Sequence, residues 1–281
     1  MSIASMMGRG LASMPAPERA EWLLAFDFDD TLHHRHEQPA VSREFFARLR
    51  ELRDERGALW GINTGRSLPY LIEGLLDCGA EFLPDFVITR EREIWTPCAL
   101  QGWQPLGDWN QRCESDHARL FAEEEEFLVG VRRFVETQTR ARWISEVGDP
   151  AGVVAVHVDE IAALCAHVDG HAGRGVELGY QRNSIYLRFC HRDYHKGSAL
   201  REVARSFGLG VAQTFAMGDG HNDLEMLQPA VAARLACPAN AIPEVRDQVL
   251  AHGGFAAQRR FSHGALDALG WAFGSGDGPV C

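Results

Sequence analysis

One short stretch near the start of the chain constrains the fold most. The mostly apolar residues Trp22 to Phe26 lead directly into Asp27-Phe28-Asp29-Asp30-Thr31. An apolar run of this length, ended by turn-forming residues, predicts a short buried strand with Asp27 and Asp29 just past its carboxyl end. Open α/β sheets bind their ligands at that edge. Clustered carboxylates repel one another, so we expect a cation that neutralises their charge or a reaction that uses them. Capping of the following helix is the alternative that these residues alone leave open.

Three further motifs also place polar or charged residues at the end of a predicted strand or at the start of a predicted helix. Asn63-Thr64-Gly65-Arg66 follows the apolar-leaning residues 58–62, and Lys196-Gly197 opens an amphipathic helix pattern. Residues 215–223 are again an apolar run that ends in acids, Asp219 and Asp223 among them. We expect the early and the late acids to meet at one sheet edge and to share a single divalent cation.

The order of the predicted elements gives the domain organisation. Strand and helix patterns alternate up to about residue 89, which predicts a doubly wound parallel α/β sheet. Residues 91–190 then combine an irregular Trp-rich part, a long helix-prone stretch and further strands, so they predict an inserted α+β domain. The core would be discontinuous, formed by residues 21–90 and 191–281, with residues 1–20 as a flexible N-terminal tail.

Composition excludes several classes of partner. The formal net charge of -11 argues against nucleic acid and against an anionic membrane as partner, because both require a basic face. The seven cysteines show no paired spacing, which indicates reduced thiols in a cytoplasmic protein and not a disulfide framework or a zinc site. No apolar stretch approaches the roughly 20 residues of a membrane helix, so transporting ATPases are excluded as well.

Together the motifs support a family resemblance. The ordered set Asp-x-Asp-x-Thr from Asp27, Thr-Gly-Arg from Thr64, Lys-Gly from Lys196 and Gly-Asp-x-x-Asn-Asp from Gly218 resembles the haloacid dehalogenase (HAD) superfamily of phosphohydrolases. The motifs cover about residues 20–90 and 192–245. The resemblance implies a Rossmann-like HAD core and a Mg²⁺-dependent phosphatase with a small phosphorylated substrate.

The resemblance assigns chemical roles to the acids. Asp27 would be the nucleophile that forms an aspartyl-phosphate. Asp29 would be the general acid and then the general base, a role for which its pKa must lie above that of Asp27. Asp219 and Asp223 would complete the Mg²⁺ site together with Asp27 and the backbone carbonyl of Asp29, since Mg²⁺ prefers oxygen ligands.

Five further residues would bind the phosphoryl group by the same resemblance. Thr64 would donate a hydrogen bond to a phosphoryl oxygen, and Gly65 and Arg66 would form the turn beside it. Lys196 would neutralise the phosphoryl charge, so Thr64 and Lys196 count as catalytic as well. Asn222 would orient Lys196 or a Mg²⁺-bound water. A lysine at a helix N-terminus opposes the helix dipole, which means that Lys196 needs an anionic neighbour.

The inserted domain refines the resemblance. Its position and α+β pattern resemble the C2B-type cap of HAD subfamily IIB (Cof-type). Residues 64–67 followed by residues 84–88, with the aromatic segment that contains Trp103 and Trp109, resemble the sucrose-phosphate phosphatase branch. A sugar phosphate is therefore the expected substrate, with Arg182 and Asn183 of a hairpin turn predicted over 181–183 as candidate sugar contacts. Two departures affect substrate identity: residues 89–93 are charged and lack the usual glycine, and no Pro-x-Gly precedes Lys196.

Other functions stay open at this point. A phosphomutase would share Asp27 and Asp29 but would transfer the phosphoryl group to a second sugar hydroxyl. A non-catalytic sugar-phosphate-binding protein would be expected to lose a carboxylate or Lys196, and none is lost. A dehalogenase is disfavoured because the Mg²⁺ acids would serve no purpose. We expect the loop with His33, His34 and His36 to be exposed and polar, not a zinc site, and the chain to be a monomer or a homodimer.

Overall fold

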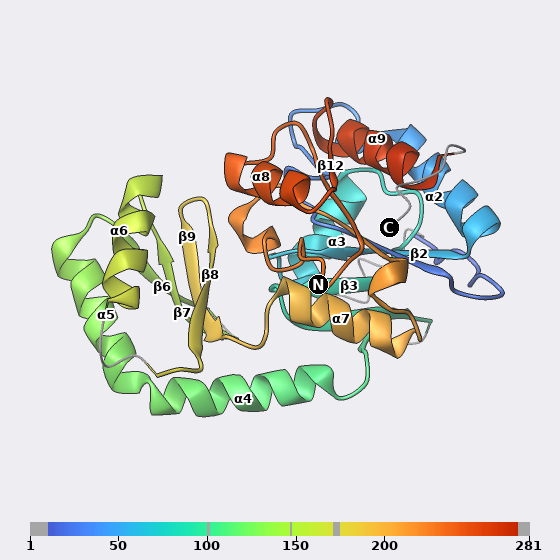
Figure 1. Cartoon of the computed structure of the whole chain (residues 1–281). Helices are drawn as coiled ribbons and strands as arrows, with labels where there is room; N and C mark the ends of the chain where they lie inside the picture. The colour runs from blue at the N-terminus through green and yellow to red at the C-terminus, as the bar shows by residue number, and fades with distance from the viewer. Residues whose placement is uncertain (1–10, 100–101, 147, 171–174, 275–281) are drawn as a thin grey trace. The chain divides into compact units, whose positions relative to one another are not determined.

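The computed structural model describes residues 11–99, 102–146, 148–170 and 175–274, and the chain divides into two compact units (Figure 1). The core unit comprises Met1–Trp109 and Lys196–Cys281, and the cap unit comprises Asn110–His195. The predicted division into a discontinuous core and an insertion differs at its first boundary, where residues 91–109 lie in the core unit.

The core unit is built on an eight-stranded sheet in the order β12-β11-β10-β1-β2-β3-β4-β5. Pairing is parallel from β12 to β3 and antiparallel from β3 to β5. The strands are β1 (Trp22–Phe26), β2 (Ala58–Asn63), β3 (Phe86–Thr89), β4 (Glu93–Cys98), β5 (Gly102–Pro105), β10 (Thr214–Met217), β11 (Arg234–Cys237) and β12 (Phe255–Ala256).

The central strand β1 is buried on both faces, as its continuous apolar sequence predicts. Leu24 and Phe26 pack into one apolar cluster with side chains of the helices that cover that face, while Leu23 and Ala25 are equally buried but lie outside this cluster. Successive side chains of a strand alternate between the two faces of its sheet, so both faces of the strand are covered. The expected doubly wound α/β core is confirmed.

The helices of the core unit are α2 (Arg43–Arg56), α3 (Leu68–Asp77), α7 (Lys196–Ser206), α8 (Pro243–Ala251) and α9 (Phe261–Phe273), with 3₁₀ turns η1 (Val211–Gln213) and η2 (His221–Asp223). Buried side chains of α2, α3 and α9 share one cluster, and α2 lies beside α9 (Figure 1). Ser42 caps α2 by accepting a hydrogen bond from the Phe45 N–H at 3.2 Å. Gly57 ends the helix with φ of 59°, where a Cβ would lie 2.2 Å from the Arg19 carbonyl oxygen.

The cap unit has its own antiparallel sheet in the order β6-β7-β9-β8 and its own apolar core. Its elements are β6 (Arg142–Glu146), β7 (Asp149–Val154), β8 (Leu178–Asn183), β9 (Tyr186–His191), α5 (Glu125–Gln138) and α6 (Val158–Asp169); α4 (Trp109–Glu123) leads into it. Helix α5 buries Phe127, Leu128, Val131 and Val135, a helical stripe at the spacing that predicts one packed face. The expected inserted α+β domain is confirmed as an architecture.

Two local expectations differ from the structure. The strands β4 and β5 extend the main sheet in antiparallel pairing, because the charged turn after β3 reverses the chain where we expected the insertion to begin. The expected tail also has structure in its described part, residues 11–20: the Ala12 carbonyl accepts from the Leu83 N–H and the Pro15 carbonyl from Arg53. Residues 1–10 of that tail lie outside the described residues.

Among the described helices, none is both long and apolar enough to cross a membrane.

Candidate active site

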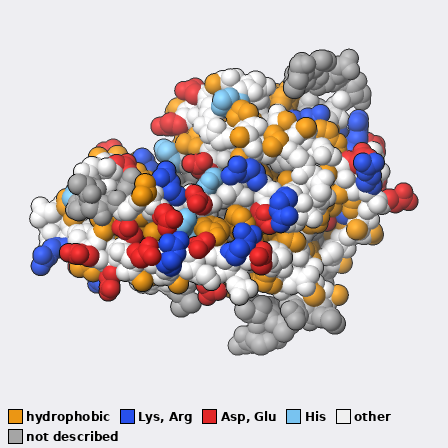
Figure 2. All heavy atoms as spheres, turned by 60° about the horizontal axis from the view of Figure 1, so that its bottom comes forward, with side chains coloured by type: hydrophobic (Ala, Val, Ile, Leu, Met, Phe, Trp, Pro, Cys, Tyr) orange, Lys and Arg blue, Asp and Glu red, His pale blue; other side chains and the backbone are white. Residues whose placement is uncertain are grey.

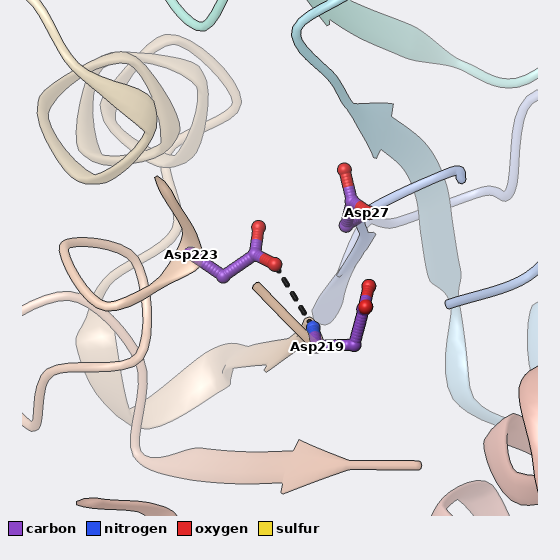
Figure 3. Close-up of side chains that lie close together, drawn as sticks. All are labelled: Asp27, Asp219 and Asp223. Atoms are coloured by element: carbon purple, nitrogen blue, oxygen red, sulfur yellow. Dashed lines mark hydrogen bonds between the residues drawn. The ribbon is translucent and has the colours of Figure 1, made fainter. Parts of the chain in front are cut away.

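Three carboxylates from distant parts of the sequence meet at the carboxyl edge of the central strands. Asp27 follows β1, Asp219 follows β10, and Asp223 lies in η2 (Figure 3). One carboxylate oxygen from each lies within 4.8 Å of one from the others. The backbone explains this convergence, because Phe26 is in register with Met217 and the Asp27 N–H donates to the Met217 carbonyl at 2.9 Å.

The loop from Gly218 to Asp223 is shaped by its last residue. Oδ2 of Asp223 accepts hydrogen bonds from the backbone N–H groups of Asp219 at 2.9 Å, drawn in Figure 3, and of Gly220 at 2.8 Å. A Cβ on Gly218 would lie 2.3 Å from Cγ of Asp223, so only glycine fits there. Thr31 donates to Oδ1 of Asp219 at 2.6 Å and orients that carboxylate.

Lys196 is the cation of the cluster. Its side chain is fully buried, and Nζ lies 2.6 Å from Oδ1 of Asp27 and 2.6 Å from Oδ1 of Asp223. It stands at the first residue of α7, and Asn63 holds that turn by donating from Nδ2 to the Lys196 carbonyl at 3.0 Å. The anionic neighbours required of a lysine at a helix N-terminus are therefore present.

Lys196 is also the single lysine in the sequence, since the other 27 of the 28 basic residues are arginines. An ammonium group concentrates its charge on one atom with three donors, whereas a guanidinium is a planar fork that matches one carboxylate at a time. Nζ here donates to two carboxylates on different elements, which is a geometry that suits lysine.

The charges of the cluster do not balance within the protein. Burial opposes the charge on Lys196, but the attraction of Asp223 and Asp27 outweighs it and raises the pKa of the ammonium. Burial raises the pKa of Asp27 well above its usual value, and although Lys196 opposes this, Asp223 and Asp219 add to it. Burial together with Asp223 raises the pKa of Asp219 to about 7. Three ionised carboxylates and one ammonium leave an excess of negative charge.

This excess fits a divalent cation. The donor set consists of carboxylate oxygens, which Mg²⁺ prefers over nitrogen or sulfur. A cation of charge two would cancel the two negative charges that remain after Lys196 is counted, and would keep Asp27 and Asp219 ionised. The residues present therefore fit the expected metal.

Asp29 is placed differently from the other acids. Arg66 binds it with both arms of the fork, Nε to Oδ2 at 2.7 Å and Nη2 to Oδ1 at 2.5 Å, and Nδ1 of His33 lies 3.5 Å from Oδ1. The Arg66 guanidinium also lies 4.9 Å from the centroid of the Phe28 ring. The side chain of Asp29 thus contacts Arg66 and His33 and is not part of the acid cluster found among the described residues.

The order of the two pKa values is the reverse of the one expected. Burial raises the pKa of Asp29, but hydrogen bonds from His33 and Arg66 outweigh burial and lower the pKa to about 2. The pKa of Asp27 is raised. We expected a bound cation to lower the pKa of Asp27 below that of Asp29. That expectation leaves out Arg66, which stabilises the Asp29 carboxylate through two charge-assisted hydrogen bonds.

The Thr64-Gly65-Arg66 turn lies at the same edge. The Thr64 N–H donates to the Ile88 carbonyl at 2.8 Å, and Oγ1 of Thr64 accepts from the Arg66 N–H at 3.2 Å. Thr64 is buried, and Gly65 lies against the carboxylate of Glu91. Arg66 is expected to bind substrate, but in this structure its guanidinium holds Asp29 and the Tyr70 carbonyl.

Glu91 and His33 are contacts of the site that the sequence patterns do not single out as site residues, and Thr31 is a motif residue to which no role was assigned. Oε1 of Glu91 accepts from Nδ2 of Asn222 at 2.8 Å. In the sequence, Glu91 is only part of the charged residues 89–93, which lack the glycine of the family pattern. The missing glycine is the one feature of the sequence that could have drawn attention to Glu91. His33 belongs to the predicted polar loop, where its ring stacks on Phe28.

The two candidate sugar contacts lie in the cap unit. Arg182 and Asn183 are the last residues of β8 and not a turn. The chain turns between β8 and β9 at the residues that follow, where Ser184 has φ of 50°. The prediction of the turn over 181–183 was wrong by about two residues, because neither Arg182 nor Asn183 needs a turn conformation.

Comparison with known proteins agrees with this architecture. A family model described as haloacid dehalogenase-like hydrolase matches residues 155–251. A protein of Streptococcus pyogenes serotype M6 named "Putative phosphatase" is 38% identical over 62 residues, which are 22% of this chain and 22% of that protein. The aligned segment is thus about a fifth of the relative's length.

Solved structures match over most of the chain. The sucrose-phosphatase of Synechocystis sp. PCC6803, solved with sucrose and phosphate, aligns with a TM-score of 0.67 and 18% identity over 89% of this chain and 97% of that chain. The HAD subclass IIB sugar phosphatase BT4131 aligns with a TM-score of 0.60 and 15% identity over 89% and 97%. At these identities the likeness shows the fold.

The fold and the site define an α/β protein with an acid-and-lysine cluster at the sheet edge and an inserted antiparallel cap sheet. Residues 155–251 are similar to the haloacid dehalogenase-like hydrolases, and the solved structures show that the chain has the subclass IIB fold.

Proposed function

We propose that this chain is a Mg²⁺-dependent phosphatase that hydrolyses a phosphomonoester, a sugar phosphate, through an aspartyl-phosphate on Asp27. The observation that carries the proposal is the convergence of three carboxylates, whose oxygens lie within 4.8 Å of one another, on a lysine that donates to two of them (Asp27, Asp219 and Asp223 with Lys196). A carboxylate nucleophile supplies the attacking group for the aspartyl-phosphate route, and a cation site and a buried ammonium supply charge neutralisation of the phosphoryl oxygens.

Each residue has a defined part in the first step. An oxygen of Asp27 attacks phosphorus while the bond from phosphorus to the alcohol oxygen breaks, and the leaving oxygen takes a proton from the carboxyl group of Asp29. Lys196 and Thr64 donate hydrogen bonds to the phosphoryl oxygens, which carry the charge of the transition state. Mg²⁺ held by Asp27, Asp219 and Asp223 would supply further charge neutralisation.

The second step reverses the proton transfer. Asp29, now a carboxylate, takes a proton from water as the water oxygen attacks phosphorus, and the bond from Asp27 to phosphorus breaks. Inorganic phosphate leaves and the Asp27 carboxylate is restored. Since Arg66 and His33 hold Asp29 ionised in this structure, Asp29 must leave that pair before it can donate a proton.

The substrate class rests on the fold and on the proposed cap contacts. The neighbours of this fold include a sucrose-phosphatase and a sugar phosphatase. Arg182 and Asn183 remain the proposed sugar contacts. On the face drawn in Figure 2, basic and acidic side chains are interspersed, which together with the net charge of -11 favours a small phosphorylated substrate over nucleic acid. A cytoplasmic location and a monomer or homodimer complete the proposal.

The test is a screen for inorganic phosphate release across a panel of sugar phosphates with Mg²⁺ and with EDTA. Asp27→Asn should abolish release, whereas Asp30→Asn, which changes an exposed carboxyl three residues along, should retain it within a few-fold. Undiminished release by Asp27→Asn would refute the aspartyl-phosphate route. Transfer to a second sugar hydroxyl in place of water would identify a phosphomutase.

A further inference from the structure

The turn after β3 contains two consecutive residues in the left-handed region. Arg90 has φ of 49° and Glu91 has φ of 67°. Glycine adopts this conformation without strain, whereas residues with a Cβ adopt it at a cost that the surrounding structure must offset. A residue held there against its preference points to a function for its side chain.

The side chain of Glu91 lies inside the site and not in solvent. It is 5% exposed, and its Oε1 would be 3.4 Å from a Cβ on Gly65. Its backbone N–H donates to the Thr64 carbonyl at 2.9 Å. The carboxylate therefore lies directly against the turn that we propose binds the phosphoryl group.

Its contact with Asn222 fixes the orientation of that amide. A carboxylate only accepts hydrogen bonds, so the atom 2.8 Å from Oε1 of Glu91 must be Nδ2 of Asn222 and not its Oδ1. The oxygen of the amide is then presented on the other side as an acceptor. Asn222 lies between Asp219 and Asp223 in sequence, so its orientation bears directly on the site.

The charge of Glu91 also acts on Lys196. Its charge is the third of the acidic influences, after Asp223 and Asp27, that raise the pKa of the ammonium. Glu91 therefore connects the phosphoryl-binding turn, the lysine and the Gly-Asp-x-x-Asn-Asp loop, which come from three separate parts of the sequence.

We propose that Glu91 is a positioning residue of the phosphoryl site: it holds Asn222 in one orientation between the turn at Gly65 and the acid cluster. The inference deepens the proposed function and rests on it. The contact that carries the proposal is the hydrogen bond from Asn222 to Glu91, so most of the effect of Glu91 should pass through that amide. That dependence separates the proposal from a purely structural role in the turn.

A double-mutant cycle tests the dependence. Glu91→Ala and Asn222→Ala should each lower kcat/KM for the best substrate at least tenfold. The double variant should be no less active than the less active of the two single variants, because either change alone already removes the contact between Glu91 and Asn222. Glu91→Gln can still accept from Nδ2 and should recover activity to within about threefold of the unchanged protein. Glu93→Gln, whose carboxylate instead faces Arg90 and Thr89, is the matched control and should be unchanged.

Losses that multiply in the double variant, or a glutamine variant as impaired as the alanine variant, would overturn the proposal. If Glu91→Ala does not fold, Asn222→Asp provides the second test. It places two carboxylates in contact, and adding Glu91→Gln should restore at least part of the lost activity, while no restoration would again overturn the proposal.

The same proteins separate this inference from the proposed function. If the unchanged chain releases no phosphate from any substrate, the phosphatase proposal fails, and the cycle is measured on binding of inorganic phosphate with Mg²⁺ by calorimetry. Coupled losses of phosphate affinity would support the role of Glu91, and additive losses would overturn it. Absence of both turnover and phosphate binding would overturn both proposals.

Discussion

Replacement of Lys196 by methionine tests the electrostatic account of the site. Methionine keeps an unbranched side chain that is one atom shorter and removes the charge, which leaves Asp27 and Asp223 buried and without their shared ammonium. Removing one partner of a buried ion pair costs about 3–5 kcal/mol, because the remaining charge loses its compensation. We place Lys196→Met in this range because the side chain is fully buried and both contacts are short.

Urea unfolding in EDTA measures this loss. With a urea m value of about 3 kcal/mol/M, the expected cost corresponds to a midpoint lower by roughly 1 to 1.7 M. The two units can unfold separately, so hydrogen exchange of peptides from β1 and β10 should identify the transition of the core unit. Saturating Mg²⁺ should recover part of the loss, because a cation on the carboxylates replaces the missing charge.

Arg205→Met is the matched control, since Arg205 is an exposed cation on the same helix whose partner is Glu202 three residues away. It should leave the midpoint unchanged within error. A Lys196→Met protein as stable as the unchanged chain in EDTA would refute the claim that the buried acids depend on this lysine.

Three further predictions concern single features of the site. Gly218→Ala should displace Asp223, because the new Cβ would lie 2.3 Å from Cγ of Asp223. It should weaken Mg²⁺ binding at least tenfold by calorimetry and leave the far-ultraviolet circular dichroism unchanged. Equal Mg²⁺ affinity would contradict the close contact of Gly218 with Asp223. Arg66→Met should raise the pKa of Asp29 from about 2 toward or above its ordinary value of about 4, measured by carboxyl ¹³C NMR in EDTA, and an unmoved pKa would show that the arginine is not the cause. In EDTA the pKa of Asp219 is about 7 in the folded chain and about 4 in the unfolded chain, so between these pH values the folded chain holds the proton that the unfolded chain has released. The contribution of Asp219 to the free energy of unfolding should therefore fall as the pH rises from about 4 to 7. Mg²⁺ or Asp219→Asn should flatten that fall in urea midpoints, and an equal slope in Asp219→Asn would contradict it.

The sheet edge could be predicted from sequence because its determinants are local. An apolar run that ends in acids specifies a buried strand and the polar residues at its carboxyl end, and parallel pairing brings Asp27 and Asp219 together wherever their strands are neighbours. The buried lysine was predictable for a related reason, since a cation at a helix N-terminus needs an anionic partner.

Other parts of the site depend on long-range geometry that no local pattern encodes. Asp29 could be assigned an acid role, but its pairing with Arg66 depends on where α3 begins, and that pairing reverses the expected order of pKa values. Glu91 lies in a turn whose positive φ values are unusual for its residue types, so no sequence pattern indicates the conformation that turns its side chain inward. The same turn places β4 and β5 in the main sheet, which no pattern in residues 91–105 indicates.

The central claim is that Asp27, Asp219 and Asp223 share one divalent cation beside Lys196. Because the chain has a single lysine, ¹⁵N-lysine labelling gives one Nζ resonance from the middle of the site. We predict that Mg²⁺ binds with a stoichiometry of one by calorimetry, that the Nζ resonance shifts with the same saturation curve, and that Asp219→Asn loses both. Mg²⁺ binding that leaves Nζ unmoved, or binding that survives Asp219→Asn unchanged, would contradict the account.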